Sequence, residues 1–139
     1  MRISNLKRAA LWLFLGCFVP GLVAAAWAGD RKTSTKTFES SAVHTAGTEY
    51  SSGFLVENYA EGVVLVNVSS LTGTPALALV AETSEDNTTY FFHSALASGI
   101  GATGTTAYPL TNFGKYLRVR QTISGATTMT YDIKGVFKN

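Results

Sequence analysis

The sequence has 139 residues, of which 46% are hydrophobic and 14% are charged. This length suits one ordinary domain, and the composition argues against intrinsic disorder. Arg2, Lys7 and Arg8 precede a long apolar run, and the rest of the chain holds eight cations against nine acids, a net charge of about −1. This balance excludes a strongly basic nucleic-acid-binding protein.

Residues 1–28 predict a secretory signal peptide, because a basic start, an apolar run, a helix-breaking Pro20-Gly21 pair and an A-x-A cleavage motif at 26–28 follow in order. The apolar stretch 9–28 is also long enough for a retained membrane anchor. Cys17 follows a sequence that weakly resembles a lipobox, which leaves lipidation open. The predicted location is secreted or at the cell surface, with membrane contact only through an uncleaved signal segment.

Residues 29–41 are polar apart from Phe38, and they predict a flexible N-terminal arm. Cys17 is the single cysteine of the sequence, so cleavage would leave a chain without disulfides. Residues 42–139 must therefore rely on core packing, and we expect them to form one domain.

That domain consists of short runs rich in Val, Thr, Tyr and Phe, which turn residues separate every 8–12 residues or so. We expect an all-β fold, an antiparallel β-sandwich of jelly-roll type with about eight strands after the signal helix. The expected strands lie near 36–45, 52–57, 62–70, 76–84, 88–94, 105–110, 115–123 and 127–137.

The last two expected strands alternate clearly between apolar and polar residues. A hairpin with a three-residue loop at 124–126 would align their apolar faces. This register would pair Arg118 with Asp132 as an ion pair on a solvated sheet face.

The strands at 62–70 and 76–84 are apolar on both faces, so both faces need cover. The second faces include Val63 and Leu65 on one strand and Ala78 and Val80 on the other. Contact with another subunit would cover them, and so would a central position in one tightly wrapped domain.

Motifs that carry chemistry are weak in this sequence. Residues 99–104 match G-x-G-x-x-G, but Pro109 and the β-type residues before it cannot open the required helix. The acidic turn at 82–87 lacks the spacing of a calcium loop. His44 and His93 are the only histidines, too few for a zinc site built on histidine and cysteine. We therefore expect no enzyme activity, no cofactor and no metal.

Tyrosines on the sandwich surface could stack on sugars, with Tyr90, Tyr108 and Tyr116 as candidates. Both tryptophans, the preferred sugar-stacking residues, would leave with the signal peptide. Glycan or cell-wall binding is thus the alternative function.

The stretch from Phe38 to Phe137 has a characteristic order of strand and turn segments. They are a Val-rich strand at 63–68, the turn Leu71–Pro75, the segment Glu82–Tyr90, and Asn112–Val119 before a last alternating strand. In this pattern the chain resembles small β-sandwich structural proteins of tailed phages and prophages, from the head, decoration or tail region. The resemblance implies the fold and a structural role, and it carries over no catalytic or binding residue. Virion proteins assemble in the cytoplasm, so the export signal indicates a related sandwich used outside the cell.

The function expected from the sequence is that of a secreted structural protein, a subunit of an extracellular filament, pilus-like fibre or surface coat. In this hypothesis the arm at 29–41 adds as a strand to the open sheet edge of a neighbour. Phe38 would fill a pocket there, and Val63, Leu65, Ala78 and Val80 would contribute to the assembly surface. The expected partner is a second copy of the chain, in a homo-oligomer or filament.

Overall fold

The computed structural model describes residues 32–139, so the predicted signal peptide lies outside the described residues. The described chain is all-β, and its seven strands are antiparallel. They are β1 (Thr33–Tyr50), β2 (Phe54–Leu55), β3 (Glu61–Thr72), β4 (Ala76–Ser84), β5 (Phe91–Ile100), β6 (Gly104–Thr111) and β7 (Tyr116–Lys138). In residues 32–139 no helix has the length and apolarity needed to cross a membrane.

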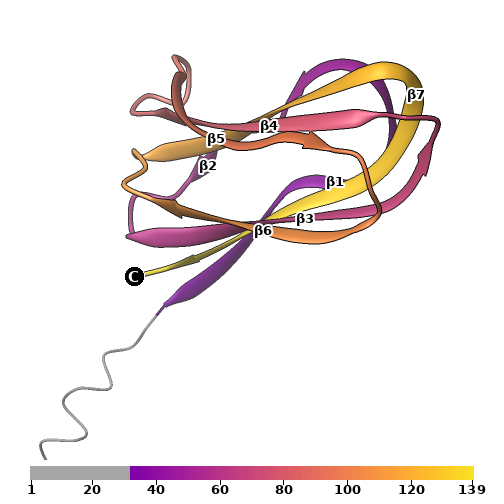
Figure 1. The fold of residues 1–139 in the computed structure, drawn as a ribbon. Helices are drawn as coiled ribbons and strands as arrows, with labels where there is room; N and C mark the ends of the chain where they lie inside the picture. Colours follow the sequence, from indigo (N-terminus) through magenta and orange to yellow (C-terminus); the bar gives the residue numbers. More distant parts are fainter. Residues whose placement is uncertain (1–31) are drawn as a thin grey trace, which may run out of the picture. The chain divides into compact units, whose positions relative to one another are not determined.

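The strands form a sandwich of two layers, as Figure 1 shows. One layer contains β5, β4 and the first half of β7, and the other contains β6, β3 and the second half of β7. β1 runs along β7 through both layers, so these two long strands hold the sandwich together on one side. The expected all-β sandwich is confirmed.

The expected hairpin of residues 115–123 and 127–137 is not present, because both segments belong to one long strand, β7. Residues 116–124 pair with β4, and residues 128–138 pair with β3, so the two halves of β7 lie in different layers and do not pair with each other. Gly125, with φ of +96°, lies where the strand bends from one layer into the other. The chain therefore turns a corner at this glycine where the sequence predicted a loop, and two expected strands merge into one.

Both members of the expected Arg118–Asp132 pair have other partners. The Arg118 guanidinium lies 2.7 Å from a carboxylate oxygen of Glu82 on β4. Asp132 accepts a hydrogen bond of 2.9 Å from the side chain of Asn67 and lies 3.5 Å from the Lys134 ammonium.

The core lies between the layers and follows the period-two alternation of the strands. On β3, Val64, Val66 and Val68 are fully buried, and their neighbours of the other parity are half-buried. Leu77 and Leu79 fill the facing side of β4, and β7 adds Leu117, Val119, Ile123, Met129, Tyr131, Ile133 and Phe137.

Phe38 belongs to this core, and this corrects the expected flexible arm. Residues 33–41 are part of β1, and the stretch from Thr33 to Glu39 pairs with the end of β7. The Phe38 ring is 5% exposed and packs edge-on against Phe54, at 5.3 Å between ring centroids, and against Phe137, at 6.3 Å. Because its side chain packs in the core of its own chain, it is not available to fill a pocket on a neighbouring subunit.

Candidate functional site

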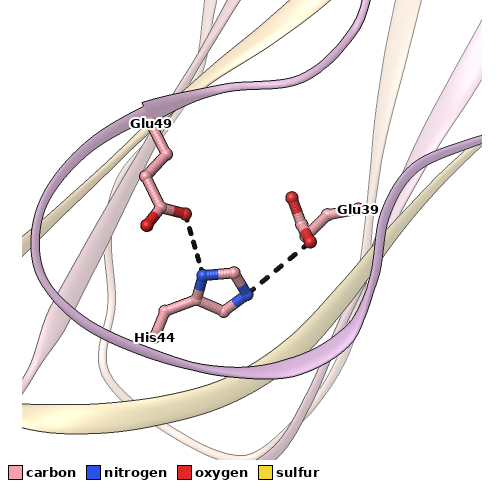
Figure 2. A group of neighbouring side chains, drawn as sticks. All are labelled: Glu39, His44 and Glu49. Atoms are coloured by element: carbon pink, nitrogen blue, oxygen red, sulfur yellow. Dashed lines mark hydrogen bonds and ion pairs between the residues drawn. The ribbon is translucent and has the colours of Figure 1, made fainter.

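The candidate site is a group of three side chains on β1, namely Glu39, His44 and Glu49. Figure 2 shows them converging inside the curve that β1 makes as it passes from one layer to the other. A regular strand would place residues five apart on opposite faces. The pairing of β1 with β7 shifts register between Thr37 and Glu39, between Glu39 and Ala42, and between Thr45 and Gly47. These irregularities re-aim the side chains, so that one ligand-type atom of each lies within 4.8 Å of the others.

The imidazole of His44 lies between the two carboxylates. Its Nδ1 lies 2.9 Å from Oε2 of Glu49, within hydrogen-bond distance. Its Nε2 lies 3.8 Å from Oε1 of Glu39, which is too long for a hydrogen bond. The other oxygen of Glu39 accepts a hydrogen bond of 3.0 Å from the side-chain amide of Gln121.

β7 supplies the buried neighbours of the cluster. The Tyr131 ring is fully buried and stacks on the His44 ring, with 4.3 Å between centroids and 27° between planes. Burial raises the pKa of the Tyr131 hydroxyl well above its usual range, and the negative charges of Glu49 and Glu39 raise it further. The hydroxyl therefore remains protonated.

Three buried polar atoms at this cluster have no hydrogen-bond partner among the described residues. They are Nε2 of His44, Oε1 of Gln121 and the hydroxyl of Tyr131, in side chains that are 8%, 2% and 0% exposed. Buried polar atoms nearly always have a hydrogen-bond partner. Three such atoms without one at the same place therefore indicate a site for a polar or charged ligand. The two ring nitrogens of His44 face carboxylates and no serine or cysteine, an arrangement that suits a cation better than a nucleophilic reaction.

The sequence did not predict this cluster, although His44 is one of its two histidines. The spacing of Glu39, His44 and Glu49 gave no signal, because only the bulges of β1 bring these residues together.

The residues predicted for assembly do not form one patch. Val63 and Leu65 are half-buried on the side of β3 that faces away from the core. Ala78 and Val80 are half-buried on the corresponding side of β4, in the other layer. Phe38 lies in the core between the layers.

The three candidate sugar-stacking tyrosines do not form one row. Tyr90 and Tyr116 flank the same layer, whereas Tyr108 lies on β6 and is partly buried against the core. The Arg118 guanidinium lies 4.0 Å from the centroid of the Tyr90 ring and 4.6 Å from that of Tyr50. These cation–π contacts occupy one face of each ring, which leaves less aromatic surface for a sugar.

The acidic turn after β4 is a self-contained hydrogen-bonded turn. The backbone N–H groups of Thr89 and Thr88 each donate a 2.8 Å hydrogen bond to the same oxygen of Asp86. These bonds hold the pKa of the Asp86 carboxyl well below its usual range.

Two phenylalanines stand out on the surface. Phe91 and Phe92, at the start of β5, are 63% and 66% exposed. A pocket of about 290 Å³ lies elsewhere on the chain, where β1, β3, β6 and β7 meet. Its apolar walls include Val63, Pro109 and Val136.

No protein-family model and no curated protein matches this sequence. Solved structures nevertheless share its fold. The VP2 subviral particle of infectious bursal disease virus matches with a TM-score of 0.59 and 10% identity, over 78% of this chain and 32% of that one. The PBSX exported protein XepA matches with a TM-score of 0.58 and 13% identity, over 75% of this chain and 36% of that one. The SPBc2 prophage-derived protein YomS matches with a TM-score of 0.53 and 14% identity, over 78% of this chain and 95% of that one.

These similarities confirm the resemblance to phage and prophage β-sandwich proteins at the level of the fold. The chain spans about a third of the length of the VP2 and XepA chains and nearly all of YomS.

Proposed function

We propose that the protein is an exported structural subunit that associates with copies of itself into filaments or another open array. The fold supports a structural role, since VP2, a protein of the same fold, is described in a subviral particle. XepA is described as an exported protein, which agrees with the predicted signal peptide at 1–28.

The observation that carries the proposal is the exposure of Phe91 and Phe92 on a free sheet edge. β5 pairs with β4 on one side, and no described strand pairs with its other side. An unpaired edge that carries two exposed aromatic rings is a typical surface for association with another chain.

The pocket beside Val63 offers a partner for one of these rings. An apolar cavity of about 150 Å³ can hold benzene, so the pocket of about 290 Å³ has room for a phenyl side chain. Glu61 and Lys138, whose charged groups lie 3.3 Å apart, form part of its polar rim.

A projecting group at one place and its pocket at another make a heterologous contact, in which the two partners use different surfaces. Such contacts repeat without closing unless the rotation between subunits happens to complete a ring. This geometry favours a filament or open array over a two-fold dimer.

This contact replaces the arm mechanism expected from the sequence. β1 is already paired with β7 in its own chain, and releasing it would expose Phe38. Of the predicted assembly residues, Val63 remains in the proposed interface as a wall of the pocket.

The test compares assembly of the wild-type protein with that of a double variant, Phe91→Ser and Phe92→Ser. Light scattering after size exclusion and negative-stain imaging should show regular assemblies for the wild type and monomers for the double variant. Val43→Ser is the matched control, because Val43 is 68% exposed on β1 and should not affect assembly. Undiminished assembly of the double variant would refute the proposed contact.

Mixing experiments test the direction of the contact. The double variant retains the pocket, so small amounts of it should cap wild-type filaments and shorten them. Val63→Trp, which fills the pocket, should cap the opposite end. If either variant co-assembles without shortening the filaments, the contact is not heterologous.

Export is tested separately by the N-terminal mass of protein recovered from the culture medium. A start at Gly29 is expected, and protein retained in the cell with its first 28 residues would contradict export.

A further inference from the structure

The three unpaired buried atoms beside the Glu39–His44–Glu49 cluster call for a partner that the described chain does not supply. They belong to different side chains, two from β7 and one from β1. Conformational rearrangement cannot easily pair them, because His44 is stacked on Tyr131 and Gln121 is held by Glu39.

We propose that this cluster is a binding site for a divalent transition-metal ion of the zinc type, bound directly by Nε2 of His44 and the carboxylate of Glu39. Imidazole nitrogen and carboxylate oxygen are common ligands of such ions, at about 2.0–2.2 Å. Two ligand atoms around a tetrahedral ion at this bond length are about 3.4 Å apart, close to the 3.8 Å between Nε2 and Oε1 of Glu39. Water completes the coordination shell.

The neighbouring contacts have the form of an outer shell around a metal. A metal-binding histidine usually donates its other ring N–H to a carboxylate, which fixes the tautomer and the ring orientation. Glu49 occupies this position on Nδ1, at 2.9 Å. The second oxygen of Glu39 is likewise held by Gln121, at 3.0 Å. Both direct ligands are thus oriented in advance.

The position of the site suggests what the ion does. Glu39 and His44 lie on either side of a register shift, where β1 leaves the regular ladder. An ion held by both would fix the two sides of this irregular segment of β1 to each other. It would act as a clamp at the bend of a domain whose described residues include no cysteine.

The experiment titrates the metal-free, full-length protein with Zn²⁺ alone, by calorimetry and by thermal unfolding. The wild type should bind one ion per chain and unfold at a higher temperature, and EDTA should reverse the shift. The ¹⁵N chemical shift of Nε2 of His44 should change on addition of Zn²⁺, a response that a purely structural histidine would not give.

Variants locate the site. His44→Gln and Glu39→Gln should each weaken binding at least tenfold, and Glu49→Gln, in the outer shell, should weaken it about 10- to 100-fold. His93→Gln is the matched control and should bind as the wild type does. Glu39 and Glu49 are 22% and 54% exposed, so their variants keep the test valid if His44→Gln fails to fold.

Two results would overturn the proposal. One is an absence of Zn²⁺ binding by the wild type, which would mean that water alone fills the site. The other is equal weakening by His93→Gln and by Glu39→Gln, which would mean adventitious surface binding. Neither result would bear on self-association, which depends on Phe91 and Phe92.

Discussion

Phe38→Ala distinguishes a strand that belongs to the fold from an arm that serves a neighbour. Phe38 is 5% exposed and packs between the Phe54 and Phe137 rings of its own chain. Replacing a buried phenylalanine by alanine typically costs about 3–5 kcal/mol of unfolding free energy. A domain of this size has a total stability of about 5–15 kcal/mol, so the variant should be folded but much less stable.

Urea unfolding followed by circular dichroism measures this loss, at two protein concentrations about a hundredfold apart. The loss should be the same at both, because the contacts lie within one chain. Val43→Ala on the same strand is the control, since Val43 is 68% exposed and should change stability by about 0.5 kcal/mol or less. A loss below about 1 kcal/mol, or one that appears only at the higher concentration, would refute the placement of Phe38 in its own core.

Gly135→Ala should cost about 1–3 kcal/mol in urea unfolding, because the added Cβ would lie 2.6 Å from the Phe137 ring; a neutral result would contradict the packing at this end of the sandwich. Arg118→Ala should cost about 1–3 kcal/mol, because it removes the closest cation from the buried Glu82 carboxylate. The loss should shrink in a Glu82→Gln background, and equal losses in both backgrounds would show that the pair is not coupled. The folded-state pKa of Asp86 is lowered, so its contribution to stability is complete above its ordinary pKa of 3.8, begins to decline below that value, and is lost only as the pH falls through the lower folded-state pKa. The urea midpoint of the wild type should therefore exceed that of Asp86→Asn at about pH 7, and the difference should shrink steadily as the pH falls below 3.8; a difference that stays constant into strong acid would contradict this.

The strands were largely predictable from the sequence, because alternation and turn residues are local signals. The extended runs at 62–70 and 76–84 correspond to β3 and β4 almost residue for residue. The prediction of a flexible arm at residues 29–41 was wrong from Thr33 on, because an edge strand and a flexible arm have similar amino-acid compositions. Most of residues 33–41 are exposed or half-buried, and Phe38 alone reaches the core, so periodicity could not distinguish the two.

The corner in β7 was misjudged for a related reason. Gly125 breaks the alternation in the same way whether the chain reverses in a hairpin or bends from one layer into the next. The choice depends on which strands are available as partners. Here β4 pairs with one half of β7 and β3 pairs with the other. Pairing between such distant segments cannot be predicted from the local alternation of apolar and polar residues.

The Glu39–His44–Glu49 cluster depends still more on tertiary structure. In a regular strand His44 would point away from both glutamates, because it is five residues from each. The register shift between Glu39 and Ala42 brings Glu39 and His44 to the same side of β1. The shift between Thr45 and Gly47, where β1 follows β7 around its corner, brings Glu49 to that side as well. Register shifts that leave no local signal in the sequence therefore create the one group of metal-ligand side chains in the described part of the chain.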